Sequence, residues 1–239
     1  MPAYKDGGFT ATIEILTAHV ETAGINVSGI DLSWITIIKE NDTALDVTLF
    51  GSLYWFNVTN GGKSPRLSLS VNLIGGSTFM QALLQCQRGS EMYLDGAATV
   101  FDGGEFPSHI LQCRDFSRVY SFSSGITFKG VRSGTVTRTI EVTDSSDIFI
   151  VGATVEGRLQ VAFNCRVDAR GCDFISGTNQ SASIFAQSGS FIDLEDATMP
   201  PGQTASISRG STLLLEPGST ISTVPSDKNN LTSSGIIYI

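Results

Sequence analysis

The chain has 239 residues and carries 15 Lys and Arg against 23 Asp and Glu, a formal net charge of −8. This acidic balance offers no basic surface to neutralise phosphates, so nucleic acid is not an expected partner. No apolar run approaches the ~20 residues that cross a bilayer. The first residues also lack a basic segment followed by an apolar stretch, so neither membrane insertion nor a secretory signal is predicted.

Residues 1–80 contain strand-like segments that share no clear register. Residues 10–15 alternate apolar and polar side chains, and residues 24–37 look like one coil of a repeating β structure. In the segment 53–58 both faces are apolar, with Trp55 on one face and Phe56 on the other. A strand of this kind is covered on both faces, either by another part of the chain or by another subunit.

Residues 77–87 fit two kinds of structure. Ser77 is a suitable helix N-cap, and apolar residues follow it at helical spacing. The second half matches a segment further along the chain, because Cys86 corresponds to Cys113. We therefore expect a strand in the second half, with a short helix at the start as the alternative.

From residue 84 to residue 221 one pattern recurs about six times: a short apolar strand, a polar turn, a second alternating strand and a Gly-bounded corner. Cys86 matches Cys113, and Gly103 matches Gly130, both at an offset of 27 residues. Later copies follow at intervals of 19 to 29 residues because their corner loops vary in length. The position after the polar turn is occupied in successive copies by Ser90, Ser117, Ser146, Cys165, Ser190 and Thr212.

A repeat of this length is too short to form a domain, and its alternating side chains are typical of half-buried strands. Stacked repeats bury a continuous column that no single repeat buries alone. The sequence therefore predicts an all-β fold, a parallel β-helix (solenoid) with a β-rich N-terminal segment. A sandwich or jelly roll is the competing prediction, but it favours Asn-Gly or Asp-Gly hairpin turns, which are scarce here.

We expect three segments. Residues 1–23 form an N-terminal attachment or capping segment, residues 24–221 form the β-helix with its clearest coils at 84–221, and residues 222–239 form a C-terminal capping strand. The end of the chain, residues 235–239, is a bare apolar strand. An uncovered strand of this kind promotes aggregation, so another element should cover it.

Several segments resemble the right-handed parallel β-helices of bacteriophage tail fibres and tailspikes. The resemblance extends from about residue 24 to residue 221, and its motifs lie at residues 30–37, 62–65, 152–155 and 209–213. It implies a homotrimer, intertwined or side by side, that is attached to the virion and binds the bacterial surface. The chain has no recognisable C-terminal trimerisation module and no long N-terminal anchor, so the mode of trimerisation and attachment stays open.

The resemblance implies a structural and adhesive virion component that binds a surface polysaccharide of the host bacterium. Its further partners would be other tail or baseplate proteins, and it would be made in the host cytoplasm before assembly into the virion. Two alternatives remain open. One is a polysaccharide-degrading β-helix enzyme (a depolymerase), and the other is a head fibre or decoration protein that binds only virion proteins.

Candidate catalytic groups are sparse. His19 and His109 are the two histidines, and neither lies in a nucleophile motif, so we expect surface or turn histidines. Asp168 and Asp193 occupy equivalent positions in successive copies and could supply the carboxylate pair of a glycosidase. A second pair is Asp102 with Glu105. Acidic residues also keep β surfaces soluble, which is the ordinary explanation for both pairs.

The candidate ligand-binding residues are aromatic. Tyr93 and Tyr120 are in register and should project outward together, and Trp55 is a third ring that could stack on a sugar. Tyrosines on sheets are also common packing residues. No known metal-binding motif is present, so the sequence predicts neither a metal nor a cofactor.

Cys86 and Cys113 share a register and should point into the buried column. A disulfide between adjacent strands is geometrically feasible. Buried free thiols are the prediction, because a protein made in a reducing cytosol keeps its thiols reduced.

Overall fold

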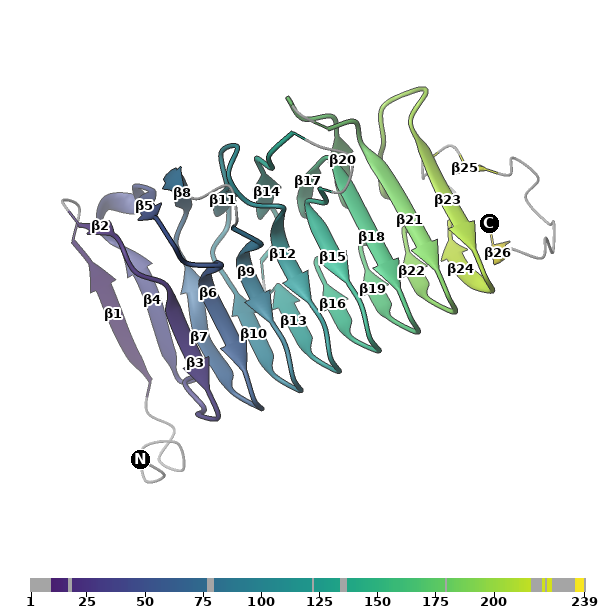
Figure 1. The fold of residues 1–239 in the computed structure, drawn as a ribbon. Helices are drawn as coiled ribbons and strands as arrows, with labels where there is room; N and C mark the ends of the chain where they lie inside the picture. Colours follow the sequence, from purple (N-terminus) through teal and green to yellow (C-terminus); the bar gives the residue numbers. More distant parts are fainter. Residues whose placement is uncertain are drawn as a thin grey trace.

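The computed structural model describes residues 10–16, 19–76, 80–121, 123–133, 137–178, 180–215, 221, 223–224 and 235–238. Across these residues the strands run parallel in three sheets, and the single helical segment is the short 3-10 turn η1 (Glu40–Asp42). No helix in this part of the chain is long and apolar enough to cross a membrane. The predicted all-β parallel solenoid is confirmed (Figure 1).

From β1 to β21 each coil of the solenoid contributes one strand to each sheet, and the later described strands belong to sheets A and C. Neighbours within a sheet lie one coil apart in the sequence. Sheet A contains β1 (Ala11–Ile15), β4 (Ile35–Lys39), β7 (Lys63–Ser68), β10 (Glu91–Leu94), β13 (Arg118–Ser121), β16 (Asp147–Phe149), β19 (Arg166–Asp168), β22 (Phe191–Asp193), β24 (Ser211–Leu214) and β26 (Gly235–Tyr238). Sheet B contains β2 (Val20–Glu21), β5 (Leu45–Leu49), β8 (Val71–Gly76), β11 (Val100–Asp102), β14 (Thr127–Lys129), β17 (Thr154–Glu156) and β20 (Asp173–Ile175). Sheet C contains β3 (Ile25–Ser28), β6 (Tyr54–Thr59), β9 (Ala82–Cys86), β12 (His109–Cys113), β15 (Ile140–Val142), β18 (Arg158–Ala162), β21 (Ser183–Gln187), β23 (Thr204–Ser208) and β25 (Thr223–Val224).

The ends of the chain extend these sheets. β1 pairs with β4 and β2 pairs with β5, so the described part of the 1–23 segment forms the first coil. At the other end, β25 pairs with β23 and β26 pairs with β24. The second half of 77–87 is strand β9, as expected, whereas the suggested helix start at residues 77–79 lies outside the described residues.

One hydrophobic core runs through the described coils. On sheet C, Phe56, Leu84, Leu111 and Ile140 are consecutive partners, and none is more than 1% exposed. Burial of each such side chain contributes roughly 1.5–3 kcal/mol, which explains why one strand face is apolar in every copy. Because stacked coils place equivalent residues of the repeat beside each other, aromatic rings in the core also stack, as Phe101 does on Phe128.

The thiols behave as predicted. Cys86 and Cys113 are paired positions on β9 and β12, and both side chains are buried and free. Burial raises the pKa of the Cys113 thiol well above its usual value, and its hydrogen bond with Cys86 raises this pKa further. Both buried side chains act as small apolar residues of the core.

The chain passes from sheet C to sheet A through a two-residue turn in which both residues have left-handed φ angles. Seven of these turns are joined in series by six backbone hydrogen bonds of 2.8–3.0 Å. In each bond the N–H of the second residue of one turn donates to the carbonyl oxygen of the first residue of the next. Glycine fits the second position, as in Gly89 (φ 71°). Phe116 holds the same position at φ 63° and is 73% exposed, which is a strained conformation for a bulky residue.

A buried ladder of hydroxyl and thiol groups follows these turns. The N–H of each ladder residue donates to the side chain of the next, at 3.1–3.3 Å. The members are Ser90, Ser117, Ser146, Cys165, Ser190 and Ser211. The sequence assignment was wrong by one residue at the last position, where Ser211 rather than Thr212 continues the ladder. The correct register buries Leu213 beside Ile192 and turns Thr212 outward beside Phe191.

Candidate functional site

The outer face of sheet A carries a row of alternating charges along the solenoid. Lys63, Glu91, Arg118, Asp147 and Arg166 are successive partners on neighbouring strands. The Nζ of Lys63 lies 2.9 Å from Oε2 of Glu91, and Nε of Arg118 lies 3.4 Å from Oδ2 of Asp147. The hydrogen bond with Glu91 raises the pKa of Lys63. Each charge thus has an opposite charge beside it, and the row is largely neutralised from within.

A second row on the same face is aromatic. The Tyr93 and Tyr120 rings stack with centroids 5.7 Å apart, and Tyr120 stacks in turn on Phe149 at 5.3 Å. The two tyrosines are therefore in register and partly exposed, as predicted. Both faces of the Tyr120 ring are covered by its neighbours, so this row presents ring edges and hydroxyls to a ligand. The register predicts that the rings are neighbours, but it does not predict that strand spacing stacks them on one another.

The hydroxyl of Tyr93 is engaged as well. It donates to the Glu91 carboxylate, and burial together with this hydrogen bond raises the pKa of Tyr93. Burial alone would raise the pKa of Glu91, but hydrogen bonds from Tyr93 and Lys63 lower it overall. The tyrosine at the end of the row is thus held in place by the charge row beside it.

Asp168 and Asp193 are neighbours on β19 and β22, as the repeat predicts. Arg170 binds Asp168 through both carboxylate oxygens, with Nε 2.9 Å from Oδ1 and Nη2 2.8 Å from Oδ2. The same guanidinium lies 3.9 Å from Oδ2 of Asp193. Its hydrogen bonds with Asp168 raise the pKa of Arg170. Because Arg170 occupies both oxygens of Asp168, the pair is arranged as a structural ion pair and not as an acid and a nucleophile facing a ligand.

Trp55 is not at the surface. It is 1% exposed and packs at 5.6 Å from the Phe56 ring in the common core. The cover for both of these apolar side chains comes from this chain, so the strand β6 does not need a second subunit to bury them. Trp55 is therefore not available to stack on a sugar.

His109 corrects the expectation of two surface or turn histidines, because it lies in strand β12 and is 8% exposed. Its Nδ1 is 3.0 Å from the carbonyl oxygen of Gln81. Its Nε2 is 3.3 Å from Oε2 of Glu141, close enough for an ion pair but without the geometry of a hydrogen bond. Burial lowers the pKa of His109, and the Glu141 carboxylate opposes this effect.

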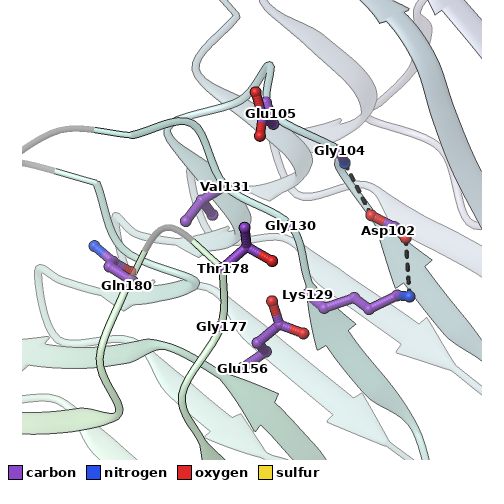
Figure 2. A pocket seen from close by; sticks show the side chains of 10 residues that line it. All are labelled: Asp102, Gly104, Glu105, Lys129, Gly130, Val131, Glu156, Gly177, Thr178 and Gln180. Atoms are coloured by element: carbon purple, nitrogen blue, oxygen red, sulfur yellow. Dashed lines mark hydrogen bonds and ion pairs between the residues drawn. The ribbon is translucent and has the colours of Figure 1, made fainter.

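A polar cavity of about 250 Å³ lies where the strands of sheet B end (Figure 2). Three successive strands bring Asp102, Lys129 and Glu156 to it, and the loops that follow add further polar groups. The polar side chains that line it are Asp102, Glu105, Lys129, Glu156, Thr178 and Gln180. The candidate carboxylate pair from the sequence, Asp102 with Glu105, lines this cavity.

The carboxylates in the cavity are held differently. Asp102 accepts a hydrogen bond from the N–H of Gly104 at 2.9 Å, and its Oδ2 lies 3.0 Å from Nζ of Lys129. Glu156 is partly buried, and within the described residues its carboxylate has neither a hydrogen bond nor an ion pair. Glu105 is exposed at the rim. Asp102 is thus neutralised by Lys129, whereas Glu156 and Glu105 remain available to a ligand.

Two glycines let the loops approach these carboxylates. A Cβ on Gly130 would lie 2.5 Å from Oδ1 of Asp102, and the positive φ of 75° at this residue also favours glycine. A Cβ on Gly177 would overlap Oε1 of Glu156. Asp102 and Lys129 each precede one of the two matching glycines, Gly103 and Gly130, so the repeat predicts that they are neighbours, and they are paired on β11 and β14. No sequence pattern indicated that Glu156 or Gly177 would join them. No cluster of three or more acidic, His or Cys side chains suited to a metal ion is found in the described ranges.

Comparison of the chain with protein-family models, with curated proteins and with solved structures finds no match in any of the three.

Proposed function

We propose that the chain is a structural and adhesive component of a phage virion, a tail fibre or tailspike, that binds a polysaccharide on the bacterial surface. The observation that carries the proposal is the polar cavity on a rigid parallel β-helix. Sugar hydroxyls need closely spaced donors and acceptors, and Lys129, Glu156 and Thr178 offer these groups within one cavity. The phage setting comes from the resemblance of the sequence to fibre and spike β-helices.

A fibre of this kind would act as a homotrimer. Three weak sites on one particle bind together more tightly than each binds alone. Large exposed side chains such as Phe50 and Phe116, 77% and 73% exposed, are compatible with further contacts to other copies or to other virion proteins. A solution mass of three times the chain mass of 25.4 kDa would support this assembly, and a stable monomer would contradict it.

A polysaccharide-degrading enzyme is the second candidate, and the same cavity favours it. Glycoside hydrolysis needs two carboxylates on either side of the scissile bond, and Glu105 and Glu156 are carboxylates without a hydrogen-bond or ion-pair partner in the described part of the chain. Asp168 and Asp193 are less suitable because Arg170 binds both.

The test is to incubate the purified chain with capsular polysaccharide and lipopolysaccharide from a panel of bacteria. Retention of the chain on at least one polysaccharide, with no release of new reducing ends, is the expected result. Release of reducing ends that Glu156→Gln abolishes would favour the enzyme. Absence of binding to every polysaccharide would contradict both candidates and favour a decoration protein that binds only virion components.

A further inference from the structure

Arg158 is a partly buried cation without a counter-ion. It begins β18 and faces the outside of sheet C, because it alternates with the core residues Leu159 and Val161. Its Nε donates to Oγ of Ser183 at 3.3 Å, and its guanidinium lies over the Phe185 ring, 4.8 Å from the ring centroid. Within the described part of the chain no carboxylate forms an ion pair with it, and its terminal nitrogens donate no hydrogen bond.

A second guanidinium lies beside it. Arg138 precedes β15, and its Nε donates to Oε1 of Gln160, which shares the outer face of β18 with Arg158. The Nη1 of Arg138 donates to Oε1 of Glu141 at 2.7 Å. The other oxygen of Glu141 accepts a hydrogen bond from Gln112, also at 2.7 Å. Both oxygens of this carboxylate are therefore occupied, and neither neutralises Arg158.

The electrostatic balance of this surface favours an anion. Arg138 and Arg158 are two guanidinium groups against the single carboxylate of Glu141, a formal net charge of +1. Burial and the positive charge of Arg138 both lower the pKa of Arg158, so both disfavour its charged form. A guanidinium nevertheless stays protonated in proteins. The unfavourable energy therefore remains in the free chain, and a bound anion would relieve it.

We propose that Arg158 and Arg138, which we call the arginine pair, bind the carboxylate of an acidic sugar. A carboxylate accepts two parallel hydrogen bonds from the edge of one guanidinium, and the terminal nitrogens of Arg158 are open to this contact. Phe185 is 36% exposed beside Arg158 and offers an apolar surface to the sugar ring. β15, β18 and β21, which carry these groups, lie side by side in sheet C (Figure 1).

The arginine pair adjoins the polar cavity at the end of sheet B. Glu156 lines the cavity and stands two residues before Arg158. Gln180 also lines it and donates to Thr137, the residue before Arg138. Neighbouring units of one polysaccharide would therefore reach both places, with an uncharged unit in the acidic cavity and an acidic unit on the arginine pair. The inference rests on the proposed polysaccharide-binding function and specifies the ligand class.

The test uses oligomers of galacturonic acid and of hyaluronan, each beside a counterpart of equal length whose carboxyl groups are reduced to alcohols. Titration calorimetry at neutral pH should show that at least one acidic oligomer binds about tenfold more tightly than its reduced counterpart, the effect expected of one charge-assisted hydrogen bond. General attraction cannot produce this preference, because the chain has a net charge of −8. Added salt should reduce the difference.

The main variant is Arg158→Gln, which should lower the affinity for the acidic oligomer to that for its reduced counterpart. Arg158→Lys keeps the charge without the planar edge and should retain part of the preference. Arg166→Gln is the matched control, because Arg166 lies over Phe191 at 5.9 Å but on sheet A, beside Asp147 of the neighbouring strand. It should leave both affinities unchanged. Circular dichroism confirms that the variants are folded, as expected because Arg158 has no ion pair to lose.

If the wild-type chain binds neither acidic oligomer more tightly than its reduced counterpart, the inference is overturned, and this comparison needs no variant. A preference for the acid that Arg158→Gln leaves intact would overturn the assignment to the arginine pair. If the chain retains a polysaccharide of the bacterial panel but shows no preference for either acidic oligomer, the inference fails and the proposed function stands. If it binds no polysaccharide at all, the proposed function fails with it.

Discussion

The backbone N–H of Ser117 donates to Oγ of Ser146, which lies 3.1 Å away in the next coil, and both residues are fully buried. The same bond recurs at each coil from Ser90 to Ser211. The hydroxyl or thiol takes the place of a water at the corner, so the buried backbone N–H groups of Ser90, Ser117, Ser146, Cys165 and Ser190 each have an acceptor. This relationship explains why serine recurs at one position of the repeat.

Ser146→Ala should therefore destabilise the fold. Alanine fits the space, but the N–H of Ser117 is left buried without an acceptor, at a cost of about 1–3 kcal/mol. Urea unfolding measures the change. Ser206→Ala on the outer side of β23 is the control and should change stability by less than about 0.5 kcal/mol. Equal effects of the two substitutions would show that the ladder does not stabilise the chain.

Phe116→Gly should not destabilise the chain, although it removes a whole aromatic ring. Phe116 is exposed and strained at φ 63°, and glycine relieves a strain of about 1–2 kcal/mol against an entropy cost of about 0.5–1 kcal/mol. Thermal unfolding should show an unchanged or higher midpoint. Phe128→Ala in the core should cost about 3–5 kcal/mol. A large loss for Phe116→Gly would mean that this ring packs against something in solution, such as a second copy of the chain.

The fold was predictable because stacking repeats one environment many times. Cys86 and Cys113, Tyr93 and Tyr120, and Asp168 and Asp193 all fall on paired positions that counting residues could find. The contacts that these side chains make at their paired positions were not predictable from the register.

Whether two in-register rings stack or spread, and whether Arg170 binds two aspartates, depends on side-chain geometry beyond the register. The cavity was missed for a related reason. Gly177 and Gln180 belong to the corner loop between β20 and β21. The corresponding loops of the other copies differ from it in length, so the repeat does not predict where these two residues lie.

His109 should make stability depend on pH. Burial lowers the pKa of His109 in the folded chain, and the positive charges of Arg138 and Arg132 lower it further. The Glu141 carboxylate acts in the opposite direction but does not cancel these effects. In the unfolded chain the pKa returns to about 6.5, so the unfolded state takes up a proton that the folded state does not. Stability should then fall as the pH drops below ~6.5, until the pH passes the lower folded pKa.

Urea unfolding over a pH series measures this slope, and His109→Gln should reduce it. A variant with the same slope as the wild-type chain would place the pH dependence on other groups.

Arg170→Gln should destabilise the chain because it leaves the carboxylate of Asp168, which is 9% exposed, without its partner. Adding Asp168→Asn should recover part of the loss, since the buried charge is then removed as well. A double-mutant cycle of unfolding free energies tests this coupling. Additive losses would mean that the ion pair does not anchor this part of sheet A.

The most direct test of the proposed function is a crystal structure of the chain with a bound fragment of a polysaccharide that it retains. We predict a sugar residue in the cavity at the end of sheet B, in contact with Glu156 and Gln180. A fragment bound instead along the Tyr93 and Tyr120 row, or at any site that leaves the cavity empty, would contradict the account.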